Sequence, residues 1–118
     1  MNSRSKGCRA ERQFRDELRA AGYTSARRGQ QFAGSPDSPD VVCPELDGFH
    51  FEVKHTERGN PFEFLAQAVR DAGAAKIPTV AMRRNLHPFL VVLRLEDFFA
   101  LLRACDLAAL ASREGKTT

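Results

Sequence analysis

The first part of the chain carries apolar residues at the spacing of a helix. These residues recur at intervals of three or four: Phe14, Leu18 and Ala21. Because this spacing aligns side chains on one helix face, and glycine commonly ends a helix, the pattern predicts a helix over residues 5–21 that ends at Gly22. Glu11 falls at the edge of the apolar face and not among the arginines, so this carboxylate needs a partner or a function.

The middle of the chain alternates apolar and polar residues with the period of a strand. In residues 49–54 the apolar side chains point to one face, and His50, Glu52 and Lys54 point to the other. Apolar runs of this kind, bounded by Gly, Pro and polar residues, predict strands. The predicted strands cover residues 23–28, 40–43, 49–54, 79–83 and 89–93, and two further helices cover residues 62–74 and 96–110. The element order is therefore αβββαββα.

This element order predicts an α/β (α+β) fold in which helices flank a small mixed sheet. With 118 residues, 42% of them hydrophobic, the chain is long enough for one core. We therefore expect one domain, residues 1–118, with a core at about 5–110 and a flexible polar tail at 111–118. Three distant cysteines, no signal-peptide pattern and no apolar run that could span a membrane favour a cytoplasmic or nucleoid-associated protein.

Positive charge gathers near the start of the chain, although the net charge is only +3. Residues 4–28 contain eight lysines and arginines against three acidic residues. A basic segment of this kind indicates an anionic partner, with nucleic acid the leading candidate. A solvated helix face explains the same charges equally well, so charge alone leaves both interpretations open.

Two acidic residues stand where an apolar environment would normally exclude them. Asp40 begins one predicted strand, and Glu52 shares a face with Lys54 on the next. If the strands pair, two carboxylates about 4 Å apart repel by roughly 4 kcal/mol at an effective dielectric of about 20, so a proton, a lysine or a cation has to neutralise them. Carboxylate oxygens suit Mg²⁺, whose bound water can attack a phosphodiester, and Lys54 can orient that water or neutralise the phosphate. His50 lies on the same face, where we expect a neighbour and not a ligand.

Pro39-Asp40 followed by Glu52-Val53-Lys54 resembles the motif of the PD-(D/E)xK nuclease superfamily. The resemblance covers about residues 5–95, with the acid at a strand start and Glu-x-Lys at the end of the next strand. Within this superfamily the chain is most similar to the small Holliday junction resolvases of archaea and phages. The matching residues are Lys6-Gly7 and Glu11 in the first helix, Arg27-Arg28 in the first strand, and Gly34-Ser35 in the loop before Asp40. The resemblance implies a restriction-endonuclease-like αβββαβ core.

The resemblance also implies a set of site residues. Asp40, Glu52 and the Val53 backbone carbonyl would bind the metal, Lys54 would assist catalysis, and Glu11 would complete the acidic cluster, in part through water. Gln67, on the helix after the Glu-x-Lys strand, would support the site. The DNA-binding residues would be Arg27, Arg28, Ser35, Lys6 and Arg9. The spacing leaves open whether Arg27 or Arg28, and whether Ser35 or Ser38, contacts the DNA.

The resemblance thus predicts a Mg²⁺-dependent DNA endonuclease, with Mn²⁺ able to replace Mg²⁺, that prefers branched DNA such as a four-way junction. It would be phage-encoded in a host cytoplasm or nucleoid-associated. Two symmetric cuts need two sites, and the apolar last helix with Phe98 and Phe99 offers a surface for a homodimer. Two alternatives remain: a restriction or repair nuclease that acts on linear duplex, and a non-catalytic nucleic-acid-binding module with a nuclease fold.

Overall fold

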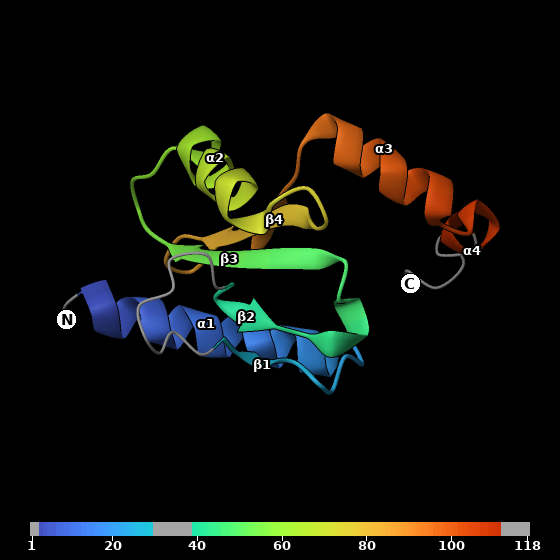
Figure 1. Ribbon diagram of the computed structural model, residues 1–118. Coiled ribbons are helices and arrows are strands. Elements are labelled where there is room, and N and C mark those ends of the chain that lie inside the picture. The colour runs from blue at the N-terminus through green and yellow to red at the C-terminus, as the bar shows by residue number, and fades with distance from the viewer. Residues whose placement is uncertain (1–2, 30–38, 112–118) are drawn as a thin grey trace.

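The computed structural model describes residues 3–29 and 39–111, which place helices on both faces of one sheet (Figure 1). The helices are α1 (Ser3–Ala20), α2 (Pro61–Ala72), α3 (Leu95–Ala104) and α4 (Leu107–Ala111). The strands are β1 (Arg27–Arg28), β2 (Val41–Val42), β3 (Phe49–His55), β4 (Ile77–Arg83) and β5 (Leu90–Val92), and a short 3₁₀ helix, η2 (Pro44–Leu46), links β2 to β3. The predicted fold class, a mixed sheet flanked by helices, is confirmed.

The sheet has five strands in the order β1-β2-β3-β4-β5. Strands β3 and β4 run parallel over seven residue pairs, and the other neighbouring strands are antiparallel. A parallel pair requires a crossover connection, which α2 supplies. Helix α1 packs on one face of the sheet and α2 on the other, so the two faces are separate environments (Figure 1).

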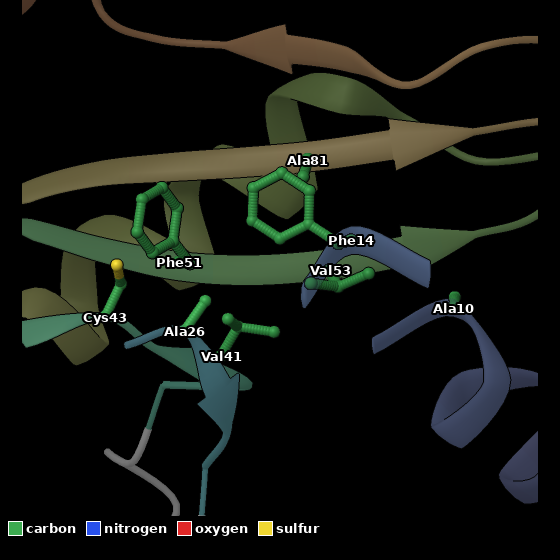
Figure 2. Close-up of a cluster of buried hydrophobic side chains, with 8 residues drawn as sticks. All are labelled: Ala10, Phe14, Ala26, Val41, Cys43, Phe51, Val53 and Ala81. Atoms are coloured by element: carbon green, nitrogen blue, oxygen red, sulfur yellow. The ribbon is translucent and has the colours of Figure 1, made fainter. Parts of the chain in front are cut away.

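The main hydrophobic core lies between α1 and the sheet (Figure 2). Its buried members are Ala10, Phe14, Ala26, Val41, Cys43, Phe51, Val53 and Ala81. The ring of Phe14 lies 5.4 Å from the ring of Phe51 and 5.5 Å from that of Phe89, so one aromatic side chain of α1 contacts both β3 and the residue just before β5. The predicted alternation along β3 is therefore correct: Phe51 and Val53 face α1, which leaves Glu52 and Lys54 on the α2 face.

Helix α2 begins and ends where its sequence signals place it. The side chain of Asn60 accepts a hydrogen bond from the Phe62 amide at 2.9 Å, and Pro61 occupies the first turn. Gly73, with φ of 69°, ends the helix. The helix runs back across the sheet from the end of β3, and Ala68 is fully buried beneath it. This close approach brings the neighbouring polar side chains of α2 onto the face that carries Glu52.

The prediction of one helix over residues 96–110 is wrong, because the structure divides it into α3 and α4. Cys105 has an extended backbone, with φ of −90° and ψ of 151°. The Asp106 carboxylate then accepts hydrogen bonds from the amides of Ala108 at 3.0 Å and Ala109 at 3.3 Å. An aspartate satisfies the free amides at a helix start, so Asp106 stabilises a new N-terminus in place of continuing the old helix.

The first strand is also shorter than predicted, since β1 contains two residues and not the range 23–28. The Ala26 amide bonds to the Tyr23 carbonyl at 3.3 Å, and the Ser25 amide bonds to the Glu45 carboxylate at 2.7 Å. Turn geometry and a side-chain acceptor thus occupy the backbone groups that a longer strand would need. The predicted loop serines and most of the predicted tail lie outside the described residues. Among the helices of the described ranges, none is long and apolar enough to cross a membrane.

Candidate active site

Strand pairing brings Asp40 and Glu52 together. Val41 stands opposite Phe51 in the antiparallel pair, and the Asp40 amide donates to the Phe51 carbonyl at 2.9 Å. The Asp40 Oδ2 atom accepts a hydrogen bond from the Val53 amide at 2.8 Å. The Asp40 carboxyl therefore reaches across to β3 beside Glu52, which is only 3% exposed. This is the juxtaposition that the spacing of the motif led us to expect, although metal binding by the pair stays a prediction.

The charge state of Asp40 reflects this crowding. Burial, followed by repulsion from the Glu52 carboxylate, raises the pKa of Asp40 to about 7. The hydrogen bond from the Val53 amide and the positive charge of Lys54 oppose this rise. Two buried carboxyl groups this close tend to hold one proton between them, and a divalent cation in the same place would displace that proton.

The Val53 carbonyl faces the same edge of β3 as the Asp40 carboxyl. Backbone groups of a strand turn to the same edge at every second residue, and both Phe51 and Val53 use that edge to bond Asp40. Metal binding by the Val53 carbonyl stays a prediction.

Lys54 is held over the same face by α2. Its Nζ atom donates to the Gln67 side-chain oxygen at 3.2 Å and lies 5.3 Å from the centre of the Phe64 ring. An ammonium group has three donors, so the contact with Gln67 fixes its direction and leaves donors for a substrate. Gln67 thus lies where a supporting residue is expected, and its role in catalysis stays a prediction.

A second set of contacts surrounds Glu52 on its other side. The His50 Nε2 atom lies 2.9 Å from the Glu52 Oε1 atom, and both side chains are buried. Asp71 of α2 joins them, since His50, Glu52 and Asp71 each offer a potential ligand atom within 4.8 Å of the others. His50 is thus the neighbour of Glu52 that the sequence predicts, whereas Asp71 is not among the predicted residues. Its position four residues after Gln67, on the same helix face, was the available signal.

Glu11 lies near this centre but is paired with an arginine. Its Oε1 atom is 3.1 Å from both Nε and Nη2 of Arg28. Burial and the nearby charge of Asp40 raise the pKa of Glu11, while Arg28 and Arg12 lower it. The interaction with Asp40 shows that Glu11 belongs to the same electrostatic cluster. Direct or water-mediated metal binding by Glu11 stays a prediction.

The predicted DNA-binding residues are distributed around two sides of the sheet. Arg27 is exposed, and its pairing with Val42 places it on the α2 face with Glu52, whereas Arg28 is turned to the α1 face and bonds Glu11. Lys6 and Arg9 lie on α1, where Arg9 lines an open depression with Arg12. The alternatives Ser35 and Ser38 lie outside the described residues.

Comparison with protein families identifies the group to which the chain belongs. Residues 2–110 match the family model described as "Phage putative PDDEXK endonuclease". No curated protein and no solved structure gives a significant match. The match includes Asp40 and the Glu52-Val53-Lys54 strand, whose side chains the fold has already brought to one place. The chain therefore belongs to the phage PD-(D/E)xK endonuclease family, and its five-stranded mixed sheet is a restriction-endonuclease-like fold.

Proposed function

We propose that this protein is a DNA endonuclease that depends on a divalent cation bound at Asp40 and Glu52. The observation that carries the proposal is the pair of carboxyl groups just before β2 and on β3, in which partial burial and then repulsion from Glu52 raise the pKa of Asp40 to about 7. A site built for stability alone gains nothing from two adjacent carboxyl groups that repel each other when both are ionised. In a non-catalytic module that binds DNA, these carboxylates would repel the phosphates and weaken binding. We therefore favour an enzyme over a non-catalytic module.

The donor set at this site fits Mg²⁺. Two carboxylates and the Val53 carbonyl are hard oxygen ligands, and a small number of such ligands leaves room for bound water. Mn²⁺ accepts the same donors and would replace Mg²⁺. When bound, the cation would acidify a water molecule and neutralise charge on the phosphate.

Lys54 supplies the positive charge next to the reacting phosphate. Gln67 and the ring of Phe64 hold its ammonium group in place, so little reorganisation is required when negative charge develops on the phosphate oxygens. His50 fixes one oxygen of Glu52 by a hydrogen bond and thereby orients the other. Asp40 is anchored on the Val53 amide and lies beside Glu52.

Arg27 is the better candidate for the phosphate contact. It is exposed on the face that carries Glu52, while the guanidinium of Arg28 is engaged with Glu11 and with the Cys8 sulfur at 3.1 Å. Arginine binds phosphate oxygens in a bidentate manner, which positions a strand without reading its sequence. Arg9 and Arg12 lie on α1, on the other side of the sheet, and would form a second basic surface. In a phage-infected cell the DNA substrate lies in the host cytoplasm, where we expect the enzyme to act.

The substrate we favour is a four-way junction cut by a homodimer. Symmetric resolution needs two active sites, and each chain carries one Asp40-Glu52 pair. Helices α3 and α4 contain no buried residue, and their exposed apolar side chains are Leu95, Phe98, Phe99, Leu107 and Leu110. A surface of this composition on a small domain is typical of an interface, and a second copy of the chain supplies the second site.

A cleavage assay with three substrates tests this proposal. Linear duplex, single strand and a four-way junction of equal length are incubated with the protein in Mg²⁺ or in EDTA. We expect cleavage only with Mg²⁺, and fastest for the junction. Equal rates on junction and duplex would exclude the resolvase activity and favour a restriction or repair nuclease. Binding without cleavage of any substrate would favour the non-catalytic module.

A further inference from the structure

A cavity of about 370 Å³ lies beside Lys54 on the α2 face of the sheet. Its floor is apolar, formed by Met82 of β4 and by Leu90 and Val92 of β5. Pro61, at the start of α2, closes one side. The turn between β4 and β5 forms the opposite rim, with Arg84 and His87. The pocket thus combines an apolar floor with a basic rim, and none of the contacts described for the active site uses it.

The strand register fixes its distance from the active site. Lys54 stands opposite Met82, and Met82 stands opposite Leu90. Paired residues point to the same face, and neighbouring strands are about 4.8 Å apart, so the cavity floor begins one strand away from Lys54. A ligand group in the cavity would therefore be adjacent to whatever phosphate Lys54 contacts.

The turn next to this cavity exposes an apolar side chain in an unusual way. Leu86 is 99% exposed and has a φ of 66°, a left-handed conformation that costs a non-glycine residue roughly 1 kcal/mol. The turn is nonetheless tied to the end of β3 through Asn85. The Asn85 amide donates to the Glu57 carboxylate at 2.9 Å, and the Asn85 side chain bonds to His55 at 2.8 Å. The structure therefore holds this apolar tip close to Arg84 of the cavity rim.

These features match the two parts of one nucleotide. A nucleobase outside the helical stack has apolar ring faces that an aliphatic floor can cover, and its phosphates carry the charge that Arg84 would neutralise. Apolar side chains such as leucine at the tip of a basic turn commonly separate stacked bases. Leu90 is 63% exposed in the described chain, so this floor is open to a ligand of that kind.

We propose that the cavity receives one unstacked nucleobase from the DNA strand whose phosphate lies at Lys54. The inference rests on the proposed nuclease function and adds a preference for DNA in which a base is already weakly stacked, as at the branch point of a junction, a flap or a bulge. Moving a base out of the stack costs less free energy in such DNA than in perfect duplex. The protein would therefore bind such DNA more tightly than perfect duplex.

Two neighbouring residues provide a matched test. Leu90 and Val91 are both exposed, at 63% and 56%, but successive residues of a strand point to opposite faces, so only Leu90 lines the cavity. The variants Leu90→Ser and Val91→Ser are compared with the unaltered protein for binding in EDTA, where no cleavage occurs. The probes are a perfect duplex and a duplex with one unpaired 2-aminopurine, whose fluorescence reports the loss of stacking.

We expect the unaltered protein and Val91→Ser to bind the unpaired-base duplex more tightly and to raise its fluorescence. Leu90→Ser should lose about 5- to 10-fold of that affinity while its binding to perfect duplex is unchanged. Equal behaviour of the two variants would overturn the pocket proposal, as would a change in oligomeric state caused by Leu90→Ser alone. Failure of the unaltered protein to bind either DNA would overturn the nuclease assignment itself.

Discussion

The Oδ2 atom of Asp40 accepts a hydrogen bond from the Val53 amide at 2.8 Å, so the two halves of the nuclease motif are joined directly. This bond anchors a carboxyl group that starts one strand on the backbone of the next. It also holds Asp40 against Glu52, and the resulting repulsion helps to raise the pKa of Asp40 to about 7. The bond thus stabilises an arrangement of charges that would otherwise separate.

Replacement of Asp40 by asparagine should remove the charge and keep the shape. The Asn side-chain oxygen can still accept from the Val53 amide, so we expect an intact fold and a melting temperature at least as high without metal. The cleavage rate should fall by at least about 100-fold. Loss of a residue that supports a metal ligand already lowers activity by about 10- to 100-fold, and loss of the ligand itself should lower it further. Binding to DNA should persist or tighten as negative charge is removed. Thermal unfolding and cleavage rates measure the two effects separately.

His50 should affect the affinity of the site for a metal ion although it is not part of the nuclease motif. His50→Ala removes the hydrogen bond that orients Glu52, so we expect Mn²⁺ affinity to fall by about 10- to 100-fold. His55 on the same strand points to the opposite face and bonds Asn85, so His55→Ala serves as the control. Titration calorimetry with Mn²⁺ measures both. Equal affinities for the two variants would contradict a role for His50 at the site.

The raised pKa of Asp40 predicts a specific pH dependence. The folded pKa, about 7, lies above the ordinary value of 3.8, so the fold favours the protonated carboxyl. Its contribution to stability is therefore greatest at low pH, declines as pH rises from about 4 to 7, and is constant above that. Metal affinity should change in the opposite direction and rise up to about pH 7, because the cation must displace the proton. Denaturant unfolding in EDTA measures the free energy of unfolding at pH 5.5 and at pH 8. Between these two pH values Asp40→Asn should lose less stability than the unaltered protein.

Arg27 and Arg28 should differ in what their loss affects. Arg27→Ala should weaken binding to all DNA sequences and reduce the salt dependence of log K by about 1, as expected for a phosphate contact. Its melting temperature should be unchanged. Arg28→Ala should instead lower the melting temperature, because it leaves the largely buried Glu11 carboxylate without its partner. Salt titrations of DNA binding and thermal unfolding distinguish the two roles, and a reversed pattern would assign the phosphate contact to Arg28.

The proposed dimer can be tested on α3. Phe98 and Phe99 are 47% and 46% exposed, so their replacement by serine should leave the fold intact and shift the protein from dimer to monomer. Val91→Ser changes an exposed apolar residue elsewhere and should leave the dimer in place. Light scattering over a range of concentrations gives the mass of each variant. An unaltered protein that is a monomer at every concentration would contradict the dimer proposal.

Most of the fold was predictable because the signals that specify it are local. The alternation along β3 separates core from site without any long-range information, and Asn60 with Pro61 marks the start of α2. The break between α3 and α4 was not predictable from the sequence, because apolar residues continue through it at helical spacing. The helix breaks at Asp106 because its carboxylate accepts hydrogen bonds from the amides of Ala108 and Ala109. This local interaction competes with continuation of the helix, and the apolar pattern of the sequence does not show which of the two is more stable.

The site shows the same division. The proximity of Asp40, Glu52 and Lys54 was predictable because motif spacing and strand pairing act over short distances. Asp71 reaches Glu52 only through the β3-α2-β4 crossover, and no sequence spacing specifies how closely α2 approaches the sheet. The partner of Glu11 was likewise hidden, since a helix and a strand 17 residues apart had to be packed before Arg28 could meet it.

Cleavage of one DNA substrate by Glu52→Gln is the most direct test of the metal-dependent nuclease. Glutamine keeps the size of Glu52 and can still bond His50, so the variant should fold normally and bind DNA. With Mg²⁺ we expect the unaltered protein to cut a four-way junction and Glu52→Gln to cut no faster than the EDTA control. A Glu52→Gln variant that cleaves with Mg²⁺ at the unaltered rate would contradict the assignment of this site.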